Sequence, residues 1–444
     1  MPNVAVPIEV RQIGFAKEGT RATAESVPTS FISLTKDSEI EFATKLIEDP
    51  ALRGVNARFP SFAGPQDAKG ALKTPARAQN IGEFLQMILG SPVSTEQASF
   101  VVTTGVNDTM DFDIGAGALS FTLAAGTYLA GQTQADAGSL CALLYAGFHG
   151  ADAVSTYTVS YSRSTGLFTI TSNAATFDLK FLTGSHTAKT VAPLIGFAVA
   201  DKTGAQTYTG TVVQTPPFKH VFTSGQVTQL PSYTFFIDRG AFNAGAKDIK
   251  QYNLGSLSKL KFNSSFDTPV ELEGTVMAQK EAAYGGAWTP VFHESPVLMF
   301  NNSTVKLAGS ASAVPNVKSW SCELDPKLVE YRPLSQQQYA YDFLAAGPYD
   351  AQGDMVVYFM DEVERAKFLA ATQSSLEILI EGSVVAGGTV KYTLDLLLPS
   401  IEYEAFPFKD QDGFLGAAVK WRARYSTGSA FVAQCYLINS KVSY

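Results

Sequence analysis

The sequence has few of the residues that build catalytic and metal centres. Its 444 residues include only 3 Cys, 4 His and 3 Trp. Cys141, Cys322 and Cys435 are far apart and odd in number, so they form neither a disulfide framework nor a zinc spacing, which fits a reducing compartment during folding. The motifs G-x-S-x-G, H-E-x-x-H and C-x-x-C are absent. We therefore expect no catalytic residues, no cofactor and no enzymatic activity.

Positive charge is scarce as well. The chain has 33 Lys and Arg against 41 Asp and Glu, a net charge of −8, which excludes a general electrostatic grip on nucleic acid phosphates. Charged residues make up 17% of the chain, which is typical of a protein that covers much of its surface in an assembly. The apolar run LCALLYAGF is half the length that crosses a bilayer, and Glu9 and Arg11 interrupt the segment where a signal peptide needs an apolar core. The sequence predicts no membrane contact and no export signal.

One short sequence occurs nearly twice. AGPQDAKG (residues 63–70) and AGPYDAQG (residues 346–353) lie 346 − 63 = 283 residues apart. Lys73 and Thr74 after the first copy suggest a phosphate-binding loop, but the lysine does not follow the glycine directly and the second copy lacks it. We interpret both copies as a turn before a strand that leads to a helix, at equivalent points of an internal repeat.

The sequences around the octapeptide also match in order. Upstream are two half-buried strands that end in Asp-Pro, and downstream are two single helices. Later segments match at offsets of 374 − 231 = 143 and 399 − 255 = 144, so the first copy has 283 − 144 = 139 additional residues. The matching pairs are 40–50 with 317–326, 75–90 with 358–373, 231–240 with 374–383, and 255–262 with 399–406.

The additional residues form a self-sufficient segment. Residues 98–211 contain alternating strand patterns separated by turns, and one helix pattern at QADAGSLCALLYAGF. Together these patterns predict a compact α+β module outside the parent fold. The whole chain is then α+β and mainly β, with a discontinuous first domain (1–97 and 212–290), the inserted module (98–211) and a second domain (291–444).

The densest carboxylate cluster, Asp108, Asp111 and Asp113, is the one metal candidate. Asp111 and Asp113 fit two positions of a calcium loop and share one face of a strand, but the glycine lies one position early and the final glutamate is missing. A solvated hairpin is the alternative interpretation. The four histidines have no neighbour at ligand spacing, which predicts surface or hydrogen-bonded side chains.

Two loop segments are rich in aromatic residues, proline and glycine. Residues 53–70 and 331–353 are long enough to be functional loops, and their aromatic content predicts packing against a neighbouring subunit. The candidate inter-subunit residues are Arg58, Phe59, Phe62, Tyr331, Tyr339 and Tyr341.

Four segments carry a resemblance to a known family: IGFAKEGTRATAE, FKHVFTSGQVTQLPSYTFFIDRG, the strand pair LSKLKF and VELEGTVMA, and VAQCYLINSKVSY. The chain resembles the tail tube proteins of long-tailed, siphovirus-type bacteriophages, in the form with two tandem tube domains. The resemblance covers nearly all of the chain outside the insertion. The insertion, with GVNDTMDFD and YTVSYSRSTGLFTITSN, is similar to a module found in several phage structural proteins.

This resemblance implies a fold and an assembly. Each tube domain is expected to be a β-sandwich with a flanking helix that adds strands to a hollow barrel. Two such domains per chain imply a homotrimer with pseudo-sixfold symmetry, whose rings stack through head-to-tail contacts that do not close. The implied partners are further copies of the chain, tape measure and tail terminator or tip proteins, and phage DNA that passes through the lumen without specific binding. The implied location is the virion tail, assembled in the host cytoplasm.

A conduit for DNA requires a polar, acidic wall, because contacts with phosphates would arrest the genome. Glu39, Glu41, Glu402 and Glu404 alternate with apolar residues in strand patterns and are the lumen-facing candidates. Solvation on the outer surface is the equal alternative for each of them.

Two other protein classes stay open. A β-sandwich surface adhesin requires an export route that the sequence lacks. A carbohydrate-binding protein that uses the inserted module requires an aromatic platform or a carboxylate pair, and Trp288, Trp320 and Trp421 all lie outside the module. Rings or tubes in electron micrographs of the purified protein favour the tail tube over both.

Overall fold

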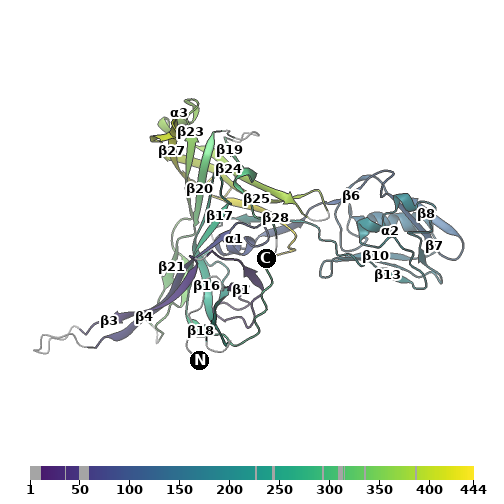
Figure 1. The fold of residues 1–444 in the computed structure, drawn as a ribbon, viewed down its shortest axis with the longest axis horizontal. Helices are drawn as coiled ribbons and strands as arrows, with labels where there is room; N and C mark the ends of the chain where they lie inside the picture. The colour runs from purple at the N-terminus through teal and green to yellow at the C-terminus, as the bar shows by residue number, and fades with distance from the viewer. Residues whose placement is uncertain are drawn as a thin grey trace, which may run out of the picture.

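The chain folds mainly into β-strands, as the sequence predicts. The computed structural model describes residues 12–35, 37–49, 60–225, 228–242, 246–292, 295–308, 314, 316–334, 337–385 and 388–444. Within these ranges it has three α-helices, which are α1 (Gly82–Leu89), α2 (Leu140–Ala151) and α3 (Val363–Leu369). Figure 1 shows a central body of strands, an arm formed by β3 and β4 on one side, and a separate unit containing α2 on the other. None of the described helices is long and apolar enough to span a membrane.

The strands of the body fall into two groups in chain order. The first group contains β1 (Gln12–Lys17), β2 (Ser30–Ile32), β3 (Glu39–Ile47), β4 (Phe62–Pro75), β5 (Val93–Glu96), β14 (Phe218–Thr223), β15 (Tyr233–Phe242), β16 (Ala246–Ser265), β17 (Glu271–Ala278) and β18 (Glu281–Ala283). The second group contains β19 (Ser303–Leu307), β20 (Val317–Asp325), β21 (Leu328–Tyr331), β22 (Asp342–Ala345), β23 (Asp350–Tyr358), β24 (Ser374–Val384), β25 (Lys391–Ala405), β26 (Phe408–Gln411), β27 (Phe414–Ala423) and β28 (Gln434–Asn439).

One set of strand pairings occurs twice. We name β1, β3, β4 and β15 to β18 the first strand set, and β19, β20, β23 to β25, β27 and β28 the second strand set. In the first set the antiparallel pairs are β1–β15, β15–β16, β16–β17, β17–β4, β4–β3 and β16–β18. In the second set the pairs β19–β24, β24–β25, β25–β27, β27–β23, β23–β20 and β25–β28 repeat this order. The order of the matching sequence segments therefore reflects matching topology.

The register of the two sets differs from the offsets read in the sequence. Gly70 of β4 lies opposite Ile40 of β3, and Gly353 of β23 lies at the corresponding point against β20. A Cβ added to Gly70 would come within 1.9 Å of the Glu39 carbonyl oxygen, and a Cβ added to Gly353 would come within 2.0 Å of the Ser321 carbonyl oxygen. A side chain has no room at either glycine. In this register the two Asp-Pro sequences, at residues 49–50 and 325–326, do not occupy corresponding positions. The reason is that β20 ends before Pro326, whereas β3 continues beyond the corresponding point.

The octapeptide prediction is correct for one copy and wrong for the other. Ala346 to Pro348 precede β23 as a bend, but residues 63–70 lie inside β4. There β3 and β4 form a longer hairpin, with Thr44 opposite Gln66 and Leu46 opposite Ala63. Pro65, which cannot donate a ladder hydrogen bond, falls in the bulge between these two pairs. The longer hairpin is the reason that the same residues form a strand instead of a turn.

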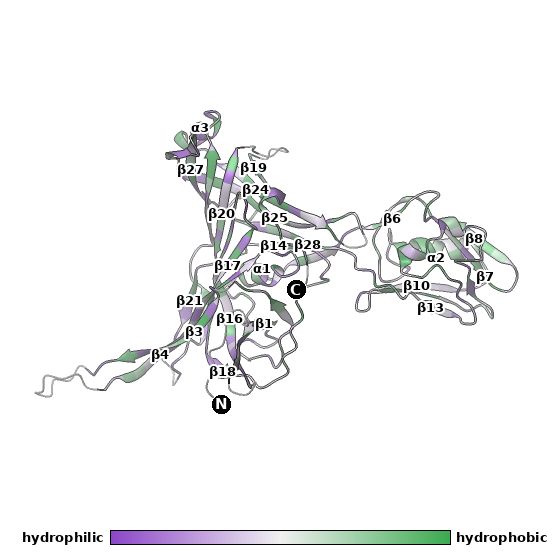
Figure 2. Ribbon diagram, in the orientation of Figure 1, coloured by the Kyte–Doolittle hydropathy of each residue, from purple (hydrophilic) through white to green (hydrophobic). Residues whose placement is uncertain are grey.

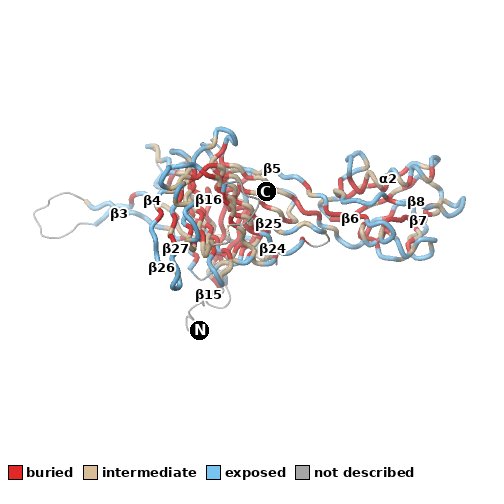
Figure 3. The backbone as a smooth tube through the Cα atoms, turned by 90° about the horizontal axis from the view of Figure 1, so that it is seen from above, coloured by how far each residue is buried: buried red, intermediate tan, exposed pale blue. Residues whose placement is uncertain are grey.

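The predicted helices are shorter than their patterns. β4 runs to Pro75 and α1 begins only at Gly82, while β23 runs to Tyr358 and β24 begins at Ser374, on either side of α3. α1 thus lies in the chain between β4 and β5, and α3 lies between β23 and β24. The main hydrophobic core contains buried residues of both sets and of α1, and Figure 3 shows this buried centre between exposed extremities.

The unit on the far side of β5 and β14 has its own core. Its strands are β6 (Phe100–Val102), β7 (Thr109–Asp113), β8 (Ala118–Thr122), β9 (Gly126–Tyr128), β10 (Tyr157–Ser162), β11 (Leu167–Ser172), β12 (Asp178–Leu179) and β13 (Thr207–Thr209). A separate cluster of buried apolar residues runs from Phe100 to Tyr208 and includes α2. β5 and β14 pair with each other, so the chain leaves and re-enters the body at neighbouring points.

Candidate functional site

The main candidate site is one face of a continuous sheet that joins both strand sets. Leu260 to Ser265 at the end of β16 pair with β20, residue Leu260 opposite Leu324 and Ser265 opposite Ser319. The sheet therefore runs in the order β3, β4, β17, β16, β20, β23, β27, β25. β26 continues β25 along the same neighbour, β27, after Phe406 and Pro407. Eight strand positions of one chain thus lie side by side.

The two faces of this sheet differ sharply. Because side chains alternate along strands, one face carries Ile40, Leu72, Leu260, Cys322 and Trp421 into the core. The other face is polar, and Figure 2 shows hydrophilic and hydrophobic residues together along the strands of the body. We name this second face the polar face. Its charged residues include Glu39, Glu41, Asp67, Lys69, Lys73, Lys259, Lys261, Glu271, Glu273, Glu323, Asp325, Asp350, Asp354, Glu402, Glu404, Lys409, Lys420 and Arg422.

Opposite charges lie next to each other across this face. A single row of directly paired residues crosses seven strands, in the order Lys73, Glu273, Lys261, Glu323, Gln352, Arg422, Glu402. Ion pairs join Lys259 to Glu323 at 2.8 Å and Arg422 to Glu404 at 2.8 Å. Lys259 and Arg422 are thus paired with carboxylates, and the face carries charges of both signs.

All four lumen-facing candidates lie on the polar face, at its two edges. Glu39 and Glu41 are exposed on β3, whereas Glu402 and Glu404 are on β25 at the opposite end of the strand order. Glu402 accepts hydrogen bonds from Gln373 and Arg424, and these bonds lower the pKa of its carboxyl. The basic residues of this face were not among the predicted site residues, although Lys259 and Lys261 in LSKLKF and Lys420 and Arg422 in VKWRAR alternate with apolar residues in the same way.

Both ends of the sheet have an unpaired edge among the described residues. β3 pairs only with β4, and β26 pairs only with β27. β26 in the second half of the chain corresponds to the end of β16 in the first half. Lys409 of β26 lies opposite Gly416 of β27, and in the same way Asn263 of β16 lies opposite Glu271 of β17. The end of β16 is covered by β20, so the corresponding edge of β26 is the place where a ninth strand would add.

The β3–β4 hairpin extends beyond its neighbours as an arm. Leu46, Ile47 and Phe62 on the arm are exposed apolar side chains. The predicted inter-subunit residues Arg58 and Phe59 lie outside the described residues. Figure 1 and Figure 3 both show the arm projecting away from the body.

The other predicted loop holds the root of this arm. The backbone N–H of Gln66 donates to the carbonyl of Gln338 at 2.8 Å, and the Arg332 guanidinium donates to the Gln66 carbonyl at 3.0 Å. Tyr339 forms a bridge with Gln66, while Tyr331 and Tyr341 are exposed and pack against each other, with ring centroids 6.0 Å apart. The two aromatic loops thus meet at one corner of the sheet, which the sequence does not reveal.

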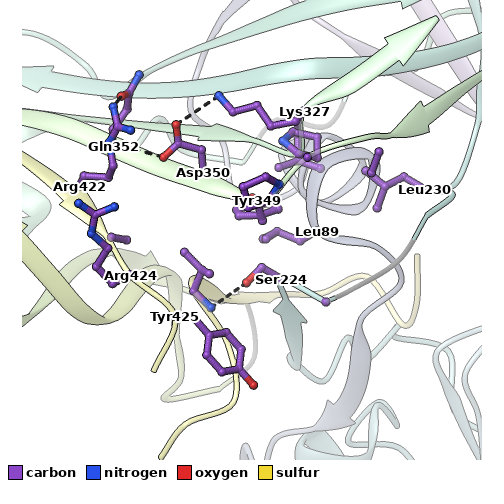
Figure 4. Close-up of a pocket in the computed structure, with 18 of the residues that line it drawn as sticks. Leu89, Ser224, Leu230, Lys327, Tyr349, Asp350, Gln352, Arg422, Arg424 and Tyr425 are labelled. Carbon is purple, nitrogen blue, oxygen red and sulfur yellow. Dashed lines mark hydrogen bonds and ion pairs between the residues drawn. The ribbon is translucent and has the colours of Figure 1, made fainter. Parts of the chain in front are cut away.

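A groove lies beside the polar face, at the junction of the two strand sets. It has a volume of about 1250 Å³, and Figure 4 shows Leu89 and Leu230 on one side with Arg422, Arg424 and Tyr425 on the other. Asp350 at its edge accepts from Lys327 at 3.2 Å and lies 3.9 Å from Arg422. Lining residues Gln352 and Arg422 also belong to the charged row, so the groove is continuous with the polar face.

The three carboxylates of the metal candidate lie at separate hydrogen-bonded positions. Asp108 accepts from the Gly105 N–H at 2.7 Å, which lowers the pKa of Asp108, and Asp113 accepts from the Gly115 N–H at 2.7 Å. Asp111 is buried and bonds to His186 Nδ1 at 2.8 Å, a partner 75 residues away. The solvated alternative is therefore wrong for Asp111. Among the described residues, no group of three or more His, Cys, Asp or Glu is arranged to hold a metal ion.

Comparison with protein families gives the class of this molecule. A model of the phage tail tube protein family matches residues 10–413. The chain therefore belongs to the phage tail tube protein family, a family of structural proteins of the virion tail. No curated protein matches the sequence.

Proposed function

We propose that this protein forms the wall of a long, siphovirus-type phage tail as stacked homotrimeric rings, and that the genome passes through their lumen. The first and second strand sets act as two tandem tube domains, and residues 98–211 as an inserted module. The repeated set of pairings supports this reading, because one chain then supplies two equivalent sectors of a ring. Three chains supply six sectors, in agreement with pseudo-sixfold symmetry.

The observation that carries the proposal is the junction between β16 and β20 within one chain. That junction joins the last strand position of the first set to the first strand position of the second. The next identical junction requires the β26 edge and a β3 strand, which are the two unpaired edges of this eight-position sheet among the described residues. An edge strand adds readily to another edge through backbone hydrogen bonds. Each copy therefore receives β3 of the next copy on its own β26.

The register of this contact follows from the internal junction. Lys261 lies opposite Glu323 and Phe262 opposite Cys322 within the chain. Transferred to the junction between copies, this register places Phe408 beside Ile40 and Lys409 opposite Glu39 of the next copy. The contact then pairs an apolar residue with an apolar residue on one face and opposite charges on the other.

The ring is wide enough for a conduit. Three chains with eight strand positions each give 3 × 8 = 24 strands. At roughly 4.8 Å between strands the circumference is about 115 Å before tilt, and strand tilt widens the barrel further. The corresponding diameter of at least about 37 Å leaves an open lumen after side chains are added.

We propose that the polar face lines this lumen, with Glu39, Glu41, Glu402 and Glu404 among its residues. Four of its cations, Lys69, Lys73, Lys259 and Arg422, pair with carboxylates, which reduces the number of cations that DNA phosphates can bind, so the genome slides without specific binding. The opposite face is excluded from this role because it is packed in the core.

The arm is proposed to connect rings. Barrel strands run at an angle to the axis, so a hairpin that continues past its neighbours projects beyond the rim of its ring. Leu46, Ile47 and Phe62 would then be covered by the adjacent ring, and Tyr331, Tyr339 and Tyr341 would support the root of the arm. Tape measure and tail terminator or tip proteins are the proposed partners inside and at the ends of the tube. Assembly takes place in the host cytoplasm.

Electron microscopy of the purified protein tests the assembly. We expect rings or tubes, and a ring mass near 3 × 47.5 = 142.5 kDa by analytical ultracentrifugation at the lowest assembling concentration. Dispersed monomers at every concentration would overturn the proposal.

A charge exchange tests the contact between copies. Lys409→Glu and Glu39→Lys should each reduce assembly, because each places like charges opposite one another, and the double variant should restore it. The matched control is Glu381→Lys with Lys391→Glu, an exposed ion pair within one chain, which should assemble like the unmodified protein. Failure of the double variant to recover would show that Lys409 and Glu39 do not meet.

A second experiment tests the lumen assignment. Glu402→Gln with Glu404→Gln frees Arg424 and Arg422 from their carboxylates, so assembled tubes should retain duplex DNA at low salt and release it at high salt. The control Glu362→Gln with Glu381→Gln removes two exposed carboxylates elsewhere and should retain no more DNA than the unmodified tubes. Equal retention by both variants contradicts the placement of Glu402 and Glu404 in the lumen.

A further inference from the structure

Helix α3 and its surroundings expose an apolar surface that has no cover among the described residues. No residue of α3 is buried, and Val363 and Leu369 are 57% and 68% exposed. Met360 before the helix is 70% exposed, and Leu415 on the neighbouring hairpin is 55% exposed. We name these four residues the α3 patch. Exposed apolar clusters of this kind on a soluble chain mark a contact with another molecule.

The inner side of α3 is already occupied by its own strand set. Tyr403 Oη donates to Glu364 at 2.6 Å, and the Phe368 ring lies 6.1 Å from that of Phe406. A cavity of about 30 Å³ between the helix and the sheets is lined by residues that include Val357, Tyr403 and Phe406. The side of α3 that faces the sheets is therefore packed around a small cavity, and the opposite side is exposed.

The corresponding helix of the first set shows what an occupied patch looks like. α1 follows β4 as α3 follows β23, and all eight of its residues are buried. Its outer side is covered by the second strand set and the chain end: Lys441 Nζ bonds to Glu83, and Tyr444 lies so close to Gly82 that a Cβ there would come within 2.0 Å of its ring. β28, which belongs to the second set, lies beside β14 over the same helix.

From this equivalence we propose that the α3 patch is the seat of a second copy of this chain, which contacts it along β18 of its first strand set. Within one chain, the second set covers the helix of the first. The next set in the ring is the first set of another copy, and β18 pairs with β16 as β28 pairs with β25. Ala282 and Ala283 on β18 are exposed and small, so they allow close approach. This inference rests on the ring assembly proposed above.

The patch is also continuous with the proposed strand contact. Phe408, which begins β26, lies 4.9 Å from Phe359 by ring centroids, and Arg365 of α3 lies 5.3 Å above the Phe408 ring. A copy that adds β3 to the β26 edge is thereby brought against α3. One partner accounts for both surfaces.

Thiol protection tests this contact directly, because the three native cysteines are buried and leave an introduced cysteine as the reactive one. Val363→Cys and Ala283→Cys should react at the monomer's rate before assembly and about tenfold or more slowly in assembled rings. The control is Val154→Cys, which is 90% exposed on the inserted module and should react equally in both states. Unchanged reactivity of Val363→Cys in intact rings overturns the α3 contact and leaves the ring proposal standing.

A charged substitution gives an independent measurement. Leu369→Asp should raise the protein concentration required for ring formation at least about tenfold, because a carboxylate would be buried in the contact. Val154→Asp should leave that concentration unchanged. Ring formation by Leu369→Asp at the concentration of the unmodified protein overturns the inference. Absence of rings from the unmodified protein overturns the ring assembly, and the inference with it.

Discussion

Helices α1 and α3 occupy the same place in two equivalent sets of strands, yet one is wholly buried and the other has no buried residue. The difference is in what covers them and not in how they are attached. α1 lies under β14, β28 and the chain end, whereas the described contacts of α3 are with β25 and Phe406 of its own half of the chain. A duplicated unit in one chain can cover its neighbour on one side only, so the last unit keeps an open surface. This comparison supports the proposal that the exposed apolar residues around α3 contact another copy of the chain.

The largest expected effect comes from truncating the core face of each helix. Phe84→Ala in α1 should lower the free energy of unfolding by about 3–5 kcal/mol, because Phe84 is fully buried and packs edge-on against Phe15. Phe368→Ala in α3 should cost only about 1–2 kcal/mol in the monomer, since that side chain is partly exposed. Denaturant unfolding of both variants checks this order, and equal losses would remove the distinction between the helices.

The next effect concerns the lysine that pairs with a glutamate of each helix. Lys441→Met leaves the buried Glu83 carboxylate without its cation and should cost about 3 kcal/mol. Lys367→Met breaks the ion pair with Glu364 within α3 and should cost less than about 1 kcal/mol. Glu83→Gln combined with Lys441→Met should recover part of the loss. If that double variant is as unstable as Lys441→Met alone, Lys441 acts through packing instead of charge.

A smaller and pH-dependent effect distinguishes the buried carboxylate of Asp238 from the partly buried carboxylate of Asp395. Asp238 in the first set accepts from the Gly240 N–H at 2.8 Å and pairs with Lys247 at 3.0 Å. One carboxylate oxygen of Asp395 in the second set has no hydrogen-bond partner among the described residues. Desolvation, and to a smaller extent the nearby Glu377, raises the pKa of Asp395 from 3.8 to about 6, while Lys306 and Lys219 act in the opposite direction.

The direction of the pH effect follows from that shift. The folded chain holds the Asp395 proton more tightly than the unfolded chain, so this group stabilises the fold below about pH 4 and loses that contribution as the pH rises through about 6. Asp395→Asn should remove this dependence between about pH 4 and 6. Unfolding curves of both proteins across that range check it, and parallel pH profiles would contradict the raised pKa.

The smallest expected effect on assembly comes from removing the module. Glu96 lies opposite Phe218 in the β5–β14 pair, so a two-residue Asn-Gly turn can replace residues 98–216. Arg163 of the module forms a salt bridge at 2.9 Å with the buried Glu96 of β5. The deletion removes this salt bridge but leaves the body core covered, because the module and the body have separate cores. We expect the shortened chain to assemble as before. A folded chain that forms no rings would show that the module takes part in the ring contact.

The sequence by itself determined the class of fold, the repeat and the separate segment. Alternating apolar residues at Ile40, Leu260 and Cys322 fix which face of each strand enters the core, because the period of a strand is two. The phage tail tube family was predicted from four segments that are distributed along the chain, and the family model confirms it.

Tertiary structure decided what no local pattern contains. The pairing of β16 with β20, the meeting of Gln66 with Gln338, and the bond between Asp111 and His186 all join residues distant in sequence. The mixed charge of the polar face depends on which strands become neighbours, and the contrast between α1 and α3 depends on where the chain end lies. The Ala-Gly-Pro part of the octapeptide lies in a strand in the first copy and in a bend in the second. In the first copy β3 pairs with it, and the backbone hydrogen bonds with β3 outweigh the local preference of Ala-Gly-Pro for a turn.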